Sequence, residues 1–203
     1  MRRHKTYSFW GFHTSTKEWG DIAKGWGAIS LAVAIAIGGF KFSFAFIITI
    51  LISAFTVGIG FLIHELAHKI VAQKYRCWAE FRSFDFMLLI AILLSFSGFI
   101  FAAPGAVMIS GKISKSQNGK ISAAGPLANF GVSGLFLLLY LLFGPTVKMI
   151  AYFGAYINAL LGLFNLIPFG FFDGRKIMNW NKVFYGIIVG TGIILMIGVQ
   201  MLF

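Results

Sequence analysis

Long runs of apolar residues, separated by short polar segments, form the main pattern along this chain. A membrane-spanning helix needs about 20 mostly apolar residues, and all runs except the first reach that length. The runs cover residues 25–40, 43–71, 84–109, 121–143, 147–168 and 183–203. The pattern therefore predicts an all-α polytopic membrane protein rather than a soluble domain.

The third run, at 84–109, differs from the others because Gly98 and the segment APGAV at 103–107 interrupt it. Glycine and proline in this arrangement are typical of turns and loops rather than of a plain spanning helix. Basic residues offer an independent test, since they concentrate on the cytoplasmic side of membrane proteins. If the third run enters and leaves on one face, all lysines and arginines except Lys41 and Lys148 share one side, whereas a crossing would divide them ten to seven.

We therefore expect five full transmembrane helices plus a re-entrant or short-strand segment, or six helices if that segment spans. The N-terminus is then cytoplasmic, in a multi-pass protein of the cell membrane. Residues 1–24 are basic and rich in tryptophan, which favours the membrane interface, so we expect a cytoplasmic or interfacial segment there. Residues 25–203 would form a single transmembrane domain. Backbone in a re-entrant segment must be buried in protein or line a wet cavity, because lipid cannot satisfy it.

The composition agrees with a membrane protein and removes several other classes. Hydrophobic residues make up 59% of the chain and charged residues only 11%, against about 25% in soluble proteins. The mean hydropathy is +0.86. A net charge of +11 would suit nucleic-acid binding in a soluble protein, but cytoplasmic basic loops account for it here, and we expect no nucleic-acid partner. The single cysteine, Cys77, excludes an internal disulfide and a cysteine-built zinc site.

The second run ends in ionisable residues, in the segment FLIHELAHKI at 61–70. Each such group costs a few kcal/mol at membrane depth, so it calls for a function. In a helix His64 and His68 share one face with Glu65 beside them, which is the H-E-x-x-H arrangement that binds zinc. A catalytic zinc takes three protein ligands and keeps one position open, so a third ligand is expected. The alternative is a hydrogen-bonded trio without a metal ion.

Asp173 is the candidate third ligand that remains after elimination. The other histidines and acidic residues lie in the N-terminal segment or in a basic loop: His4, His13, Glu18, Asp21, Glu80 and Asp85. For Glu80 and Asp85 we expect solvated loop salt bridges. The crossing count places Asp173 on the same side as the end of the helix that carries His64. Its alternatives are a helix cap or a partner for Arg175.

Three motifs occur in order: HELAH at 64–68, AGPLAN at 124–129 and NLIPFGFFDG at 165–174. Together they resemble the site-2 protease family of intramembrane zinc metalloproteases, whose N-x-x-P-x-x-x-x-D-G pattern is matched at Asn165, Pro168, Asp173 and Gly174. The resemblance covers roughly residues 43–182. It implies that Asp173 is the third zinc ligand and that Asn165 lies near bound substrate.

The same resemblance implies that PGAVMISG, at 104–111, is an edge strand or re-entrant element beside the substrate. The expected contacts are Pro104, Gly105, Ala106 and Val107. This chain departs from the family where Gly170 and Phe171 replace a usual further proline and Arg175 replaces a common glycine. These departures concern gating and substrate exit more than the metal site.

The expected function is hydrolysis of peptide bonds in transmembrane-helix substrates, within or near the bilayer. Zn²⁺ would be held by His64, His68 and Asp173, and Glu65 would carry the proton. A substrate helix must unwind first, and strand addition to residues 104–111 could hold it. Two alternatives remain: a zinc transporter, which should carry more ionisable residues along a pathway, and a non-catalytic scaffold, which would not need Glu65.

Other polar and glycine positions carry smaller expectations. Asn129 is expected to make an inter-helix hydrogen bond, and Asn165 has the alternative of an amide that packs within its own helix. Gly186 and Gly190, spaced as G-x-x-x-G, fit close helix packing within the chain or in a homo-oligomer. The expected partners are therefore a transmembrane protein substrate, the lipid bilayer and possible further copies of the chain.

Overall fold

Helices dominate the computed structural model, which describes residues 6–9, 12–99 and 105–202. Five helical segments in this part of the chain are long and apolar enough to cross a membrane. They are α1 (Thr16–Gly38), a continuous segment of α2 (Phe44–Ser53), η1 (Ala54–Gly58) and α3 (Ile59–Lys74), then α5 (Lys115–Leu142), α6 (Pro145–Asn165) and α8 (Lys182–Gln200). The prediction of an all-α polytopic membrane protein with five long helices is confirmed.

The third apolar run forms a short helix and then a strand. Helix α4 (Asp85–Ser95) has 11 residues, which at 1.5 Å per residue is about half of a 30 Å hydrocarbon core. Strand β4 (Gly105–Ser110) pairs antiparallel with β3 (Trp78–Ser83). The expected short-strand segment is therefore present, and in the part of the chain that the structure describes no strand pairs with its other edge.

Strand β3 was not predicted, and the expectation of a solvated loop at Glu80 was wrong. Glu80 is only 4% exposed within β3, and Ala79 and Phe81 beside it are buried as well. The strand forms because it pairs with β4, which follows more than 20 residues later in the chain. Pairing over that separation leaves little local signal in six residues.

The N-terminal region is more ordered than an interfacial tail. Strands β1 (Thr6–Phe9) and β2 (Phe12–Ser15) form an antiparallel hairpin that leads directly into α1. Helix α1 begins at Thr16 rather than near residue 25, because the Ser15 side chain accepts a hydrogen bond from the Glu18 backbone N–H and caps it. Glu18 and Asp21 therefore lie in the first turns of a helix, buried against the rest of the protein.

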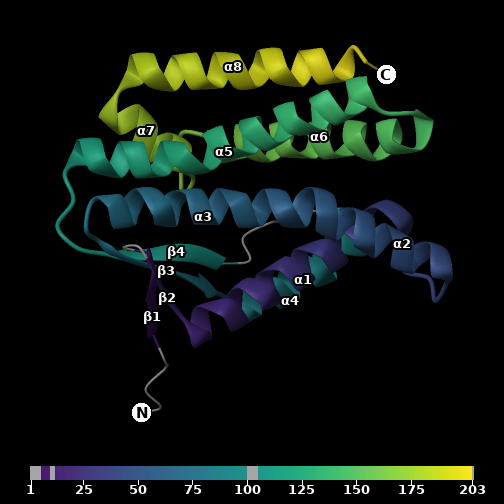
Figure 1. Ribbon diagram of the computed structural model, residues 1–203, viewed down its shortest axis with the longest axis horizontal. Coiled ribbons are helices and arrows are strands. Elements are labelled where there is room, and N and C mark those ends of the chain that lie inside the picture. Colours follow the sequence, from purple (N-terminus) through teal and green to yellow (C-terminus); the bar gives the residue numbers. More distant parts are fainter. Residues whose placement is uncertain (1–5, 10–11, 100–104, 203) are drawn as a thin grey trace.

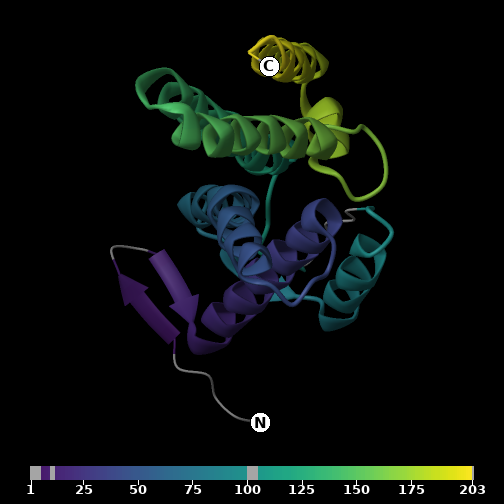
Figure 2. The ribbon, with the colours of Figure 1, turned by 90° about the vertical axis from the view of Figure 1, so that its right-hand side faces the viewer.

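Helix α3 lies in the middle of the molecule, between two groups of elements (Figures 1 and 2). The two-stranded sheet of β3 and β4, with α1 and α4, lies on one side of α3. Helices α5, α6 and α7 (Asp173–Trp180) lie on the other side. Helix α8 is outermost and lies over α5 and α6. A hydrophobic cluster that includes Ile29, Phe61, Phe81 and Ile157 joins α1, α3, β3 and α6. The residues of α3 are thus held from both sides.

A turn of π-helix, η1, ends at Gly58, six residues before His64 of α3. Such turns leave backbone groups without their usual helical partner. The Asn158 side chain of α6 donates to the Thr56 carbonyl at 3.3 Å and to Gly154 at 2.8 Å. A Cβ on Gly60 would lie 1.8 Å from Asn158 Oδ1, so the two helices approach closely just before the histidines.

The G-x-x-x-G pair of the last helix, Gly186 and Gly190, faces open space within the described residues. A Cβ on Gly186 or Gly190 would meet no atom within 4 Å. They therefore do not mediate packing within this chain. Assembly of several copies through α8 stays a prediction.

Candidate metal centre

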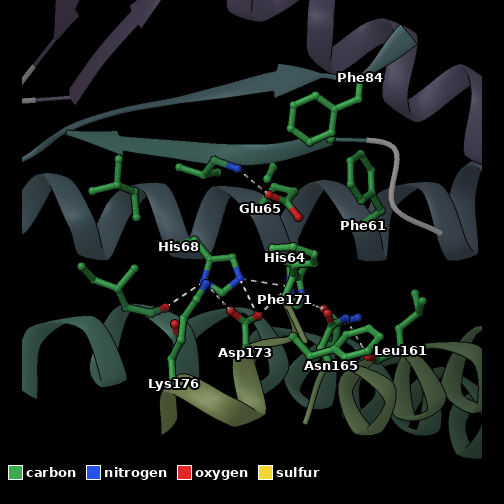
Figure 3. Close-up of a pocket in the computed structure, with 18 of the residues that line it drawn as sticks. Phe61, His64, Glu65, His68, Phe84, Leu161, Asn165, Phe171, Asp173 and Lys176 are labelled. Carbon is green, nitrogen blue, oxygen red and sulfur yellow. Dashed lines mark hydrogen bonds and ion pairs between the residues drawn. The ribbon is translucent and has the colours of Figure 1, made fainter. Parts of the chain in front are cut away.

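His64, His68 and Asp173 come together at one buried point between α3 and α7 (Figure 3). The two histidine Nε2 atoms lie 3.0 Å apart. Asp173 Oδ2 lies 3.0 Å from His68 Nε2 and 3.4 Å from His64 Nε2. All three residues are buried, at 5%, 8% and 8% exposure. Within the described residues, this is the group of histidine, cysteine and acidic side chains that could hold a metal ion.

A tight turn delivers Asp173 to the histidines as the first residue of α7. Gly174 follows it, and a Cβ there would lie 2.0 Å from the Leu166 carbonyl oxygen. Only glycine lets the chain fold back so closely on the end of α6. The Tyr185 hydroxyl of α8 donates to the same Leu166 carbonyl at 2.9 Å. The glycine that follows the aspartate in NLIPFGFFDG is therefore a geometric requirement of this turn.

Helix α5 orients both imidazole rings through contacts to their Nδ1 atoms. The His68 Nδ1–H donates to the Ile121 carbonyl at 2.7 Å, and His64 Nδ1 lies 3.0 Å from Asn129 Oδ1. A carbonyl oxygen can only accept, so Nδ1 of His68 carries a proton and Nε2 is the ring nitrogen left to bind a metal ion. Partners of this kind fix the tautomer and orientation of metal-binding histidines. Both Nε2 atoms consequently face Asp173.

The residues fit a zinc ion in three respects. Tetrahedral zinc with bonds of about 2.0–2.1 Å places its ligand atoms about 3.3 Å apart, close to the three separations here. Two imidazoles and one carboxylate leave a fourth position open, as in catalytic zinc sites. Gly125 of α5 provides room, since a Cβ there would lie 2.4 Å from His68 Nε2 and 2.5 Å from His64 Nε2.

Burial alone acts to raise the pKa of Asp173, but the adjacent His68 and His64 rings outweigh it and lower the pKa below its ordinary value. The carboxyl is therefore ionised at neutral pH, as a metal ligand must be.

Glu65 points away from the three ligand atoms, toward β4 (Figure 3). Its Oε2 accepts a hydrogen bond from the Val107 backbone N–H at 3.1 Å. A cavity of about 360 Å³ connects the strand with the metal ligands. The predicted site residues that line it are His64, Glu65, His68, Gly105, Ala106, Val107, Asn165 and Asp173. Pro104, which was also predicted, lies outside the described residues.

Asn165 shows the expected packing within its own helix, while its contact with substrate stays a prediction. It lines the cavity, and its Nδ2 donates to the Leu161 carbonyl of the preceding turn at 2.9 Å. Asn129 makes the inter-helix hydrogen bond that was predicted, but the partner, His64, was not foreseen. The AGPLAN motif was the sequence signal that could have indicated this contact with the metal centre, since the motif contains both Gly125 and Asn129. The Ile121 carbonyl is a backbone group and has no sequence signal.

The other acidic candidates lie in ion pairs away from this centre. Glu80 is paired with Arg82 and accepts from the Ser15 hydroxyl at 3.1 Å. Asp85 is exposed, and the Lys24 ammonium 3.1 Å away lowers its pKa by hydrogen bonding. The predicted salt bridges are therefore present, although Glu80 is buried in a strand and Asp85 pairs across to α1.

Comparison with known proteins supports a zinc enzyme. The chain is 40% identical over 153 residues to the protein named "Putative zinc metalloprotease MJ0611" of Methanocaldococcus jannaschii, covering 73% of this chain and 80% of that protein. The chain belongs to this zinc metalloprotease family. It is also 30% identical over 123 residues to "Zinc metalloprotease MJ0392" of the same organism, which covers 60% of this chain and 31% of that protein. No family model matches the chain. No solved structure matches it.

Proposed function

We propose that this membrane metalloprotease is an intramembrane protease of the site-2 type, which hydrolyses peptide bonds in transmembrane-helix substrates. The observation that carries the proposal is the meeting of His64, His68 and Asp173 on helices of a multi-pass membrane protein. The family relationship supports a zinc-dependent protease. The three motifs from 64 to 174 support the finer assignment to the site-2 type.

Zinc bound by the three ligands would polarise the substrate carbonyl and make water nucleophilic at neutral pH. Glu65 would accept the proton of the attacking water and later deliver it to the leaving nitrogen. In this structure the Val107 N–H donates a hydrogen bond to the Glu65 carboxylate, so strand β4 determines the position of the general base before the reaction. Small rotations about the Glu65 side chain would move it between the strand and the reacting atoms.

Strand β4 supplies an edge on which an unwound substrate could lie. Val107 is paired opposite Phe81, yet its N–H bonds to Glu65 rather than to β3. Its backbone polar groups therefore point away from β3, as alternate residues of an antiparallel strand do. Those of Gly105 and Ile109 share this direction, and both residues line the cavity. An extended peptide added here would run past Glu65 and the metal ligands.

The cytoplasmic assignment rests on charge. If each of the five long helical segments crosses the membrane once, in chain order, then the ends of α3 and α6 and the start of α8 lie on the same side of the membrane. Nearly all of the basic residues lie on that side as well. We infer that this side, including the N-terminus and the metal centre, faces the cytoplasm. A zinc transporter is not favoured, because the described residues contain one such ligand group rather than a series along a pathway.

The substitution Glu65→Gln tests the proposal in purified protein reconstituted with a single-span substrate. The amide keeps the size of the side chain but cannot accept a proton. Zinc content should stay at one per chain while the cleavage rate falls about 10²–10⁴-fold. The control is Asp85→Asn, which changes an exposed acid outside the cavity and should cleave at the wild-type rate. Wild-type-like cleavage by Glu65→Gln would refute the mechanism, and a wild type that loads zinc but leaves helix-destabilised membrane substrates intact would refute intramembrane proteolysis.

A further inference from the structure

A groove of about 830 Å³ adjoins the cavity that holds the metal ligands. The two spaces share five lining residues: Phe84, Ala106, Asn118, Phe171 and Lys176. Phe84 belongs to the strand side of the cavity, whereas Phe171 and Lys176 come from the side of α7 (Figure 3). A peptide that passes the metal ligands in an extended conformation therefore has the groove within reach of its next few residues.

Positive charge gathers in this groove. Lys115, the first residue of α5, and Arg175 and Lys176 of α7 line it, and none of the described residues that line it is acidic. Within the described part of the chain, the Lys115 side chain has no counter-ion. Arg175 donates to the neutral Gly170 carbonyl at 3.4 Å. Lys176 lies 3.6 Å from Asp173 Oδ1, a carboxylate that it shares with the two histidines.

The general excess of basic residues on one side of the membrane explains the sign of this charge but not its position. Lys112 and Lys120 belong to the same side and do not line the groove. Arg175 stands where the site-2 pattern has a common glycine, so this charge is a feature of the chain rather than of the motif. The amides of Asn118 and Asn179 also line the groove, and each can donate a hydrogen bond to a carboxylate.

A substrate segment next to its transmembrane helix is the occupant that the position favours. The groove shares Ala106 of β4 and Asn118 of α5 with the cavity, so it is reached by the chain that is cut there. Cytoplasmic flanks of membrane helices are usually basic, and like charges placed together oppose binding. An acidic flank would instead meet opposite charge. An anionic lipid headgroup has the same charge but does not have to enter the cavity.

We propose, building on the proteolytic function above, that the groove binds an acidic segment of the substrate on the metal-centre side of the membrane. Lys115 and Arg175 then determine specificity: they attract carboxylates and repel the basic flanks of other membrane helices. Both residues line the groove and not the cavity of the metal ligands. Their contact with substrate is therefore the same before and during bond cleavage, and it changes KM rather than kcat.

Three single-span substrates that differ only in this flank test the proposal. The flank carries a run of glutamates, of glutamines or of lysines. Cleavage is measured with zinc-loaded protein in phosphatidylcholine vesicles at low salt. For the wild type we expect KM to rise about 10-fold from glutamate to glutamine and again from glutamine to lysine, since several exposed ion pairs each contribute modestly. The kcat values should agree within about threefold. At about 1 M salt, where the Debye length is about 3 Å, the KM differences should largely disappear.

Substitutions in the groove should change this order without disturbing the metal. Lys115→Gln/Arg175→Gln should bring the three KM values to within about threefold, and Lys115→Glu/Arg175→Glu should favour the lysine flank. Lys176 is left unchanged because it contacts a ligand carboxylate. The matched control is Lys112→Gln/Lys120→Gln, which removes the same charge from the same side and should keep the wild-type order. Zinc content should equal that of the wild type in every variant.

Three results would overturn the proposal. The first is a wild type whose KM does not depend on the flank, and the second is a control that loses the preference as fully as Lys115→Gln/Arg175→Gln. The third is found by adding phosphatidylglycerol: if it changes the KM of all three substrates alike, and only when Lys115 and Arg175 are present, the groove holds lipid instead. If the charge-reversed variant does not fold, the glutamine variant decides.

Failure of the proposed function is distinguishable from failure of this proposal. If the wild type cleaves none of the three substrates, proteolysis fails. The affinities of the same substrates for zinc-loaded Glu65→Gln protein then test the groove, because binding does not need the general base. Equal affinities for the acidic and basic flanks would overturn the groove as a substrate site.

Discussion

Helix α3 buries ionisable side chains on two of its sides, and the two sides differ in how completely they are bonded. Toward β3 and α1, Lys69 pairs with Glu18 at 2.5 Å, with both side chains almost fully buried. Toward α5 and α7, His64 and His68 face Asp173. The residues His68 and Lys69 are neighbours in sequence, yet they belong to sites of opposite character.

The Lys69 side is a closed network. Glu18 also accepts from the Phe81 backbone N–H at 2.9 Å and from the Thr14 hydroxyl at 2.7 Å. The Lys69 ammonium lies 4.3 Å from the centre of the Phe12 ring. Opposite charges meet, hydrogen bonds satisfy the remaining oxygen, and little space is left. We interpret this arrangement as structural, because each charged group has its partners and little space remains for a ligand.

The histidine side is open by comparison. It adjoins a cavity of about 360 Å³, Gly125 leaves room beside both Nε2 atoms, and within the described residues Asn129 Nδ2 has no hydrogen-bond partner. Burial of charge therefore does not by itself identify a functional site in this protein. The unfilled space and the unsatisfied group distinguish the site from the structural ion pair on the same helix.

The largest effect should follow removal of a ligand from the open side. In Asp173→Ala the two histidines remain but lose the anionic third ligand, so zinc content should fall to near zero and cleavage to background. Zinc is measured by elemental analysis after dialysis against a weak chelator. The comparison is Glu80→Ala, which removes a buried acid outside the cavity and should leave the folded protein loaded with zinc. Full loading of Asp173→Ala with loss of zinc from Glu80→Ala would reverse the ligand assignment.

The second-largest effect should come from filling the space beside the histidine Nε2 atoms. In Gly125→Ala, a methyl group would lie within 2.5 Å of both Nε2 atoms and compete with the ion. We expect zinc affinity to fall at least about 10-fold, the lower end for a disturbed metal shell, with proportional loss of activity at limiting zinc. Gly131→Ala, on the same helix, meets nothing within 4 Å and is the matched control. Equal zinc affinity in the two variants would show that the space beside Gly125 is not the metal position.

The open side was largely predictable from sequence, whereas the closed side was not. His64 and His68 follow from helical periodicity, and Asp173 follows from elimination and from the distribution of basic residues. The pair of Lys69 and Glu18 joins positions 51 residues apart, and neither has a local pattern that names the other. Glu18 was instead expected in an interfacial tail.

The missed strand has a similar cause. The segment at 78–83 contains charged and aromatic residues that read as a loop, and only its pairing with β4 and the packing of Phe81 against Phe61 make it a strand. Contacts from the backbone, such as Ile121 carbonyl to His68, leave no residue-type signal at all. Local sequence patterns therefore identified the candidate metal ligands. The contacts that hold those ligands in place depend on tertiary structure and could not be predicted from local sequence.

The smallest effect on catalysis should come from the closed side, although stability should fall. In Lys69→Met the apolar chain is retained but Glu18 loses its counter-charge, and removal of one partner of a buried pair typically destabilises by about 3–5 kcal/mol. Unfolding in detergent micelles measures this loss. Cleavage per folded, zinc-loaded molecule should stay within about threefold of wild type, because no atom of Lys69 or Glu18 belongs to the metal-ligand group.

The double variant Lys69→Met/Glu18→Gln sharpens the comparison. It removes both charges while the amide can still accept from Phe81 N–H, so it should regain part of the stability lost in Lys69→Met, as expected for coupled neighbours. The same logic does not hold on the open side, where removing a second ligand would lower zinc binding further rather than restore it. If the double variant is no more stable than Lys69→Met and both lose zinc, then the ion pair is coupled to the metal centre, and the two sides of α3 act as a single site.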